Sequence, residues 1–160
     1  MEIILIAAVS KNRIIGSNGN IPWDIPEDIS QYKERIKDET VVFGRKSFDP
    51  DHGRSSPSKH QLILSRDDRS TDNNSATYVS NVDETINLAK EMGVEKLLVL
   101  GGGEIYSQFL ELADKMILSE IPNTYSGTTK FPEWDNSQWE VTDREKYDKF
   151  EIAHYERNSN

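Results

Sequence analysis

Residues 21–29, with the sequence IPWDIPEDI, contain the side chain with the clearest chemical potential in this chain, the carboxyl group of Asp28. Pro26 suits the first position of a helix, where its missing N–H costs nothing. Apolar residues at helical spacing predict a helix over residues 26–37 with one core-facing stripe: Ile25, Ile29, Tyr32 and Ile36. Asp28 lies on the border of that stripe. A carboxyl group there either interacts with the positive end of the helix dipole or acts as a proton donor in a pocket, and spacing alone leaves both open.

A second feature is the run Gly101-Gly102-Gly103, which follows an apolar segment and opens an expected helix. Glycines at such a place let a ligand approach the backbone closely and point amides at a phosphate. The Rossmann fingerprint G-x-G-x-x-G is not satisfied, because Tyr106 occupies the third glycine position. The run is therefore either a phosphate-proximal turn of another kind or only a tight turn.

Cations follow two further apolar segments. Gly44-Arg45-Lys46-Ser47 is similar to the tail of a Walker A loop, but Glu39 stands where the upstream glycine belongs. Leu64-Ser65-Arg66 repeats the arrangement at the next apolar segment. Open α/β folds bind ligands in the crevice outside the carboxyl ends of their parallel strands. Together with the glycine run, these two segments predict an anion site, and the alternative is that Arg45, Lys46 and Arg66 are solvated loop charges.

Apolar runs alternate with helical patterns along the chain. Strands buried on both faces are expected at residues 3–9, 41–43, 62–64, 97–100 and 116–118. Further helices are expected over residues 82–92, with Asn81 and Glu84 as a capping pair and Gly93 as the stop, and over 104–112. This order predicts an α/β fold, a single domain over residues 1–160 with a central, mostly parallel twisted sheet and helices on both faces. A C-terminal antiparallel hairpin of residues 139–143 and 150–155 should close the sheet, and residues 52–59 and 66–76 should form polar loops.

The composition limits the partners. The 160 residues carry a formal net charge of −9, which argues against nucleic acid because phosphate binding needs a basic surface. With only 35% hydrophobic residues, such acidity is expected of a protein kept folded in concentrated salt, and an ordinary acidic protein is the alternative.

The remaining sequence features concern location and metals. The absence of cysteine excludes disulfide and thiolate chemistry and fits a reducing cytoplasm. Residues 1–9 predict a buried strand rather than a signal peptide, and no apolar run is long enough to span a membrane. His52, His60 and His154 lack metal-ligand spacing, so no metal site is predicted.

Short motifs follow one another in a characteristic order: Ile6-Ala7-Ala8, Ile15-Gly16, Ile21-Pro22-Trp23 with Pro26-Glu27-Asp28, Gly44-Arg45-Lys46-Ser47-Phe48, Leu64-Ser65-Arg66, Gly101-Gly102-Gly103-Glu104-Ile105-Tyr106 and Thr129-Lys130-Phe131-Pro132. In order and spacing they resemble the dihydrofolate reductase family over nearly the whole chain. The resemblance implies reduction of 7,8-dihydrofolate to tetrahydrofolate with NADPH, by a monomer that binds neither nucleic acid nor membrane.

The resemblance also assigns the catalytic roles. Asp28 matches the pocket carboxyl group that grips the pterin 2-amino group and ring N3, and that promotes protonation of N5 while hydride reaches C6. Ser119 matches a hydroxyl residue that hydrogen-bonds this acid, and Trp23 would hold a water near it. The pterin and nicotinamide would be lined by Ile6, Ala8, Ile29, Tyr32 and Leu100.

The implied cofactor site draws on many strand ends and loops. Gly101 and Gly102 match a cis Gly–Gly peptide, Tyr106 would touch the nicotinamide region, and residues 16–21 match a mobile loop that closes over the cofactor. The 2′-phosphate would face Arg45 and Arg66, and the pyrophosphate would face Lys46, Ser47, Gly103 and Glu104. Other expected cofactor contacts are Ala8, Ile15, Gly16, Ile21, Gly44, Leu64, Ser65, Leu100, Ile105 and Thr129.

The chain departs from the family pattern at the substrate tail. Lys59 stands where an arginine usually clamps the α-carboxylate, and Arg54 is the competing candidate. Residues 49–56 are polar where aliphatic side chains usually line the benzoyl ring in the family. Glu104 replaces a cation found in some relatives, and the final hairpin is short. Two rival functions stay open: a riboflavin-pathway pyrimidinone reductase of the same fold, and a nucleotide-binding module without catalysis.

Overall fold

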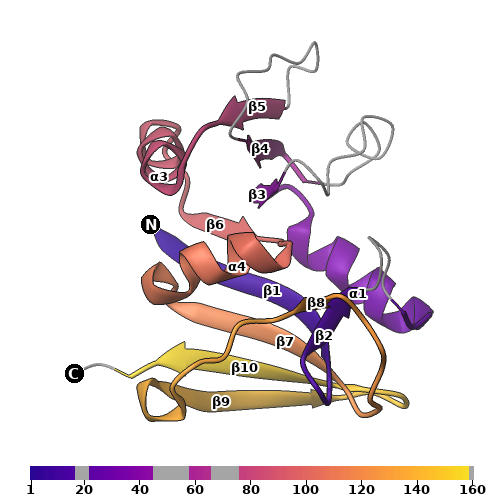
Figure 1. Ribbon diagram of the computed structural model, residues 1–160. Helices are drawn as coiled ribbons and strands as arrows, with labels where there is room; N and C mark the ends of the chain where they lie inside the picture. The colour runs from indigo at the N-terminus through magenta and orange to yellow at the C-terminus, as the bar shows by residue number, and fades with distance from the viewer. Residues whose placement is uncertain (17–21, 45–57, 66–75, 159–160) are drawn as a thin grey trace.

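The computed structural model describes residues 1–16, 22–44, 58–65 and 76–158 (Figure 1). Its main sheet has eight strands in the order β5-β4-β3-β6-β1-β7-β10-β9. Their bounds are β1 Glu2–Ser10, β3 Thr40–Gly44, β4 His60–Leu64, β5 Ala76–Val79, β6 Lys96–Val99, β7 Lys115–Ile121, β9 Trp139–Lys146 and β10 Glu151–Arg157. A separate two-stranded ribbon pairs β2, Ile14–Gly16, with β8, Thr129–Lys130.

The strand directions confirm the predicted fold class. Parallel pairing joins β5, β4, β3, β6, β1 and β7. The last strand, β10, runs antiparallel to both β7 and β9, so the expected C-terminal hairpin closes one side of the sheet. Because the parallel strands share one direction, their carboxyl ends lie along the same edge, where ligands of open α/β folds bind.

Helices cover both faces of this sheet because alternate residues of the strands are buried on opposite sides. Ile3, Leu5, Ala7 and Val9 of β1 belong to the cluster that includes residues of α3, Val82–Glu91, and α4, Gly103–Phe109. Ile4 and Ile6 belong instead to the cluster that includes Ile36 and Tyr32 of α1, Pro26–Ile36. Two short 3-10 helices complete the described elements, Leu110–Leu112 and Asn136–Gln138.

Local signals set the helix ends. The Asn81 side chain accepts a hydrogen bond of 2.8 Å from the Glu84 amide, and the Glu84 carboxylate accepts one of 2.8 Å from the Ser80 amide. This confirms the expected capping pair of α3. Gly93 follows the helix with a φ of 73°, the left-handed conformation that favours glycine at a helix stop.

Some expectations about the elements are wrong. Ile29 is 47% exposed rather than core-facing, because the cluster that packs α1 on the sheet involves Tyr32 and Ile36 further along the helix. Ala76 begins β5 instead of ending a loop, and the helix expected over 104–112 ends at Phe109 and tightens into a 3-10 turn. The short strands β2 and β8 were not expected either.

Candidate active site

The carboxyl group of Asp28 lies in the first turn of α1 and is buried, with 8% of the residue exposed. Ser119 Oγ donates a hydrogen bond of 2.6 Å to Asp28 Oδ1. Gln31 Nε2 donates to the same oxygen at 2.8 Å, and it lies 3.3 Å from Ser119 Oγ. Since Ser119 belongs to β7, these contacts join the helix to the sheet, and both donors that the described residues supply to Asp28 contact Oδ1.

Apolar side chains share this face of the sheet with the acid. Ser119 pairs in register with Ala8 of β1, and Ile117 pairs with Ile6. Ile6 is buried and Ala8 half-buried, and Tyr32 and Leu100 pack against the same cluster as Ile6. Ile6, Tyr32 and Leu100, which are expected to line the pterin and nicotinamide, therefore gather on one face, whereas Ile29 of α1 is exposed.

Two tyrosine hydroxyls lie within this region. Tyr106 Oη donates a buried hydrogen bond of 2.7 Å to the Ile6 carbonyl. Burial raises the pKa of Tyr106 well above its usual range, and the charge that Tyr32 would carry raises it further. Burial likewise raises the pKa of Tyr32 to about 12. Both phenols are therefore neutral near pH 7, and the hydroxyl hydrogen of Tyr106 is donated to the Ile6 carbonyl.

The turn after β6 depends on glycine. The Gly101–Gly102 peptide bond is cis, as the resemblance implied, and Gly101 has a φ of 107°. A Cβ on Gly101 would lie 2.9 Å from the Tyr106 ring, whereas a Cβ on Gly102 would meet no atom of the described residues within 4 Å. The Gly101 carbonyl accepts a hydrogen bond of 2.8 Å from the Gly44 amide, so the ends of β3 and β6 are joined here. Gly102 thus presents bare backbone at the carboxyl edge of the sheet.

The start of α4 meets the small ribbon at this edge. A Cβ on Gly103 would lie 2.8 Å from Thr129 Cγ2 and 3.8 Å from Ile15 Cδ1. Gly16 pairs with Thr129 in the ribbon, and the buried Ile105 packs against Gly44. These expected cofactor residues are therefore brought together, while Glu104 is exposed on the first turn of α4.

Other predicted residues lie further away or outside the described part of the chain. Leu64 and Ser65 are buried at the carboxyl end of β4. Lys59 is exposed before β4, beside Glu39, at the opposite end of the strand. Trp23 packs against Tyr125 with a ring-centroid distance of 5.2 Å. The expected contacts that lie outside the described residues are Ile21, Arg45, Lys46, Ser47, Arg54 and Arg66.

Sequence reasoning missed Gln31. It lies three residues after Asp28, a spacing at which a glutamine and an aspartate on one helix can hydrogen-bond. That spacing was the available signal.

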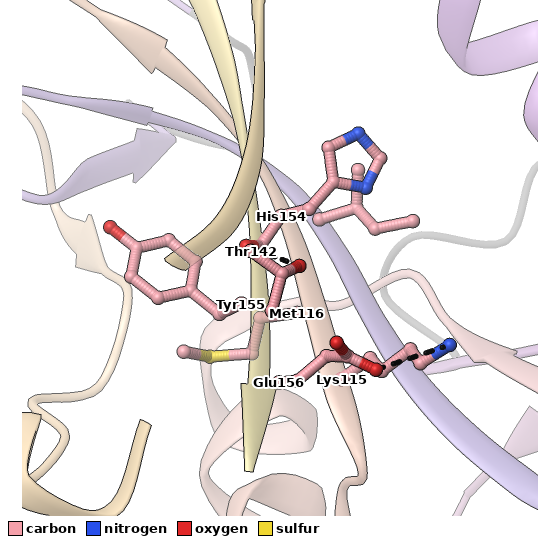
Figure 2. Close-up of a pocket in the computed structure, with 7 residues that line it drawn as sticks. Lys115, Met116, Thr142, His154, Tyr155 and Glu156 are labelled. Atoms are coloured by element: carbon pink, nitrogen blue, oxygen red, sulfur yellow. Dashed lines mark hydrogen bonds and ion pairs between the residues drawn. The ribbon is translucent and has the colours of Figure 1, made fainter. Parts of the chain in front are cut away.

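Two surface hollows lie outside the cluster of Asp28, Ser119 and Gln31. A hollow of about 400 Å³ lies beside Trp23 and Tyr125, and a smaller one of about 130 Å³ lies on β7 and β10 (Figure 2). Within the four described ranges, no group of His, Cys, Asp or Glu side chains could hold a metal ion. The helices described in the structure include none long and apolar enough to cross a membrane.

A mostly parallel sheet with a glycine turn after β6 and a buried acid on the helix that covers one face is typical of α/β enzymes that bind small molecules outside the carboxyl ends of their strands. Comparison with known proteins specifies the class. The sequence profile of the dihydrofolate reductase family matches residues 2–159, and the chain belongs to this family.

Individual relatives agree with this assignment. Dihydrofolate reductase HdrB of Haloferax volcanii is 37% identical over 164 residues, which cover 98% of this chain and 84% of that protein. Dihydrofolate reductase 1 of Haloarcula marismortui is 29% identical, with 99% of this chain and 92% of that protein covered. A solved structure of dihydrofolate reductase from Enterococcus faecalis, complexed with NADP(H) and RAB-propyl, superposes with a TM-score of 0.86 at 25% identity and covers 99% of this chain and 97% of that one.

Proposed function

We propose that this protein reduces 7,8-dihydrofolate to 5,6,7,8-tetrahydrofolate with NADPH, and that Asp28 promotes the proton transfer. Membership of the dihydrofolate reductase family supports the reaction, and the NADP(H) complex of the similar Enterococcus faecalis enzyme supports the cofactor. The observation that carries the proposed role of Asp28 is its burial at the first turn of α1, with both described donors on a single oxygen.

Asp28 binds and orients the pterin in this proposal. Its Oδ2 accepts hydrogen bonds from the pterin 2-amino group and ring N3, while Ser119 and Gln31 hold Oδ1. A charge-assisted hydrogen bond of this kind is stronger than a neutral one and fixes the ring plane. Ile6, Tyr32 and Leu100 exclude water from the faces of the ring, which strengthens the polar contacts at its edge.

The carboxyl edge of the sheet fits a dinucleotide. Bare backbone at Gly102 leaves space before the start of α4, whereas Gly103 is packed against Thr129. Ala8, Leu100 and Tyr106 would hold the nicotinamide end, and Gly44, Ile15, Gly16 and Thr129 the rest. When bound, NADPH supplies the hydride that adds to C6 of the substrate, and the proton added at N5 balances the charge.

The cofactor phosphates need local positive charge in a chain of net charge −9. We assign the 2′-phosphate to Arg45 and Arg66 and the pyrophosphate to Lys46, Ser47 and the backbone of Gly103 and Glu104. The α-carboxylate of the substrate is assigned to Lys59, with Arg54 as the alternative cation. Similarity to the Haloferax and Haloarcula proteins, together with the acidic composition, supports a protein adapted to concentrated salt.

A direct spectrophotometric assay tests the function. Protein, NADPH and dihydrofolate are mixed in concentrated salt and the loss of reduced-nicotinamide absorbance is followed. Asp28→Asn should remove most of the turnover while NADPH binding stays close to wild type. Asp24→Asn is the matched control, because Asp24 is an exposed acid of the same segment.

Three outcomes would contradict the proposal. Turnover on the riboflavin-pathway pyrimidinone instead of dihydrofolate would indicate the related reductase. NADPH binding without oxidation would indicate a nucleotide-binding module. A normal rate in Asp28→Asn would exclude the assigned role of the acid.

A further inference from the structure

A network of hydrogen-bonded side chains extends from Asp28 to the C-terminal hairpin. Gln31 Oε1 accepts a hydrogen bond of 2.6 Å from Arg35 Nε, one turn further along α1. Arg35 Nη2 then contacts Glu145 Oε2 on β9 at 2.5 Å, and His154 Nε2 on β10 contacts the same oxygen at 2.6 Å. The network therefore connects Asp28 with one helix and two strands.

Arg35 and Asp28 together fix which way the Gln31 amide faces. An amide group has a donor end and an acceptor end, and a 180° turn exchanges them. Arginine can only donate, so its hydrogen bond holds the oxygen of Gln31 towards Arg35 and the nitrogen towards Asp28 and Ser119. The Asp28 carboxylate can only accept, so it favours the same orientation: a reversed amide would set its oxygen against Asp28 and its nitrogen against Arg35.

Glu145 and His154 fix Arg35 in turn. Ser119 pairs in register with Ile152, and Ile152 pairs with Glu145, so these three residues lie in one row across β7, β10 and β9. Paired residues point to the same face, which places the Glu145 carboxylate on the side of the sheet that bears Asp28. Figure 2 shows the His154 imidazole and the Tyr155 ring on opposite sides of β10.

The three side chains at the far end of this hydrogen-bond network are moderately shielded from solvent. The exposed fractions of the side chains are 22% for Arg35, 35% for Glu145 and 25% for His154. The hydrogen bond from His154, followed by that from Arg35, holds the pKa of Glu145 below its usual value. Lys115 and Glu156 line the hollow next to His154 and pair with each other at 3.6 Å.

We propose that Gln31 is a positioning residue for the catalytic acid, and that Arg35, Glu145 and His154 act through it by fixing the orientation of its amide. The inference rests on the proposed function of Asp28. In this proposal Gln31, the second donor to Asp28 Oδ1 after Ser119, fixes the carboxyl group so that Oδ2 points to the substrate. Surface ion pairs contribute little to stability, so the Arg35–Glu145 pair is expected to act on turnover more than on unfolding.

The test compares four variants with wild type: Gln31→Leu, Gln31→Glu, Arg35→Met and the Gln31→Leu/Arg35→Met double variant. Loss of one hydrogen bond to a charged group predicts a fall in kcat of about tenfold for Gln31→Leu, with the KM for NADPH unchanged. Gln31→Glu keeps the shape but places an acid against Asp28, so its turnover should fall further and recover partly as the pH is lowered. The matched control is Lys33→Met, an exposed cation of the same helix.

The double variant isolates the route of the effect. If Arg35 acts through Gln31, the double variant should be no slower than Gln31→Leu alone, because the energies of coupled residues do not add. Additive losses would overturn the proposed route. Turnover of Gln31→Leu and Gln31→Glu within twofold of Lys33→Met would overturn the positioning role itself.

A readout without turnover separates this inference from the proposed function. The side-chain amide of Gln31 should give ¹H–¹⁵N signals that exchange slowly with solvent, and Arg35→Met should shift them and speed their exchange. The same signals unchanged in Arg35→Met would contradict the inference. Absence of dihydrofolate reduction by wild type would instead contradict the proposed function, whatever the amide signals show.

Discussion

Replacing Gly102 with alanine tests whether the turn after β6 contacts the cofactor or is only a tight turn. A Cβ at this position would meet no atom within 4 Å in the part of the chain that the structure describes, so the folded protein should accommodate it without a clash. Gly102 also has a φ of −74°, which an L-residue adopts readily. Alanine restricts the unfolded chain more than glycine does, so the free energy of unfolding should be unchanged or higher by about 0.4–1 kcal/mol.

The affinity for NADPH, in contrast, should fall in Gly102→Ala. If the cofactor packs against the bare backbone, the new methyl group overlaps it, and overpacking of a contact costs about 1–3 kcal/mol. That cost corresponds to an NADPH Kd about 5- to 150-fold weaker. The assay is a fluorescence titration with NADPH together with a urea unfolding curve of the same sample.

Two further glycines serve as controls. Gly93→Ala also adds a Cβ with nothing within 4 Å, but at a φ of 73° after α3, so it should lose about 1–2 kcal/mol of stability with NADPH affinity unchanged. Gly101→Ala places the Cβ 2.9 Å from the buried Tyr106 ring and should destabilise the fold itself. An NADPH Kd for Gly102→Ala within twofold of wild type, with normal stability, would refute the proposal that NADPH packs against the Gly102 backbone.

Other predictions concern stability. Tyr106→Phe leaves the buried Ile6 carbonyl without its donor and should cost about 1–3 kcal/mol in urea unfolding; an unchanged midpoint would contradict this. The pKa of Glu145 is lowered by the hydrogen bonds from His154 and Arg35, so its contribution is present above the ordinary value of 4.5 and is lost as the pH falls through the lowered value. Glu145→Gln should therefore flatten the acid limb of the stability curve below about pH 4.5, and an equally steep limb would argue against the pairing. Added salt should raise the unfolding temperature of a chain of net charge −9, and a flat or falling trend would exclude salt adaptation.

The parts of the fold that sequence predicted well are those with strong local signals. Continuous apolar runs predicted the buried strands β1, β3, β4, β6 and β7, and the residues around Asn81 and Gly93 predicted both ends of α3. The turn at Gly101 was expected because glycines followed an apolar run. Strands β2 and β8 have only three and two residues and give no readable periodicity.

The candidate site was predicted only as far as residue type and family resemblance reach. Asp28 and Ser119 are 91 positions apart, and no local pattern reports their contact. The link to Glu145 and His154 depends on the register of the hairpin, which is shifted by an irregularity between His154 and Tyr155. The exposure of Ile29 depends on where the sheet cluster ends, which helical spacing alone does not reveal.

The position of β1 has a consequence for synthesis of the chain. This nine-residue apolar strand lies in the interior of the sheet, but its neighbours β6 and β7 come from residues 96–99 and 115–121. A ribosome therefore exposes β1 with both backbone edges unpaired until more than half of the polypeptide has emerged. Such segments are prone to associate with other chains, and parallel pairing at long sequence separation is slow. The nascent polypeptide should consequently be the form most dependent on chaperones.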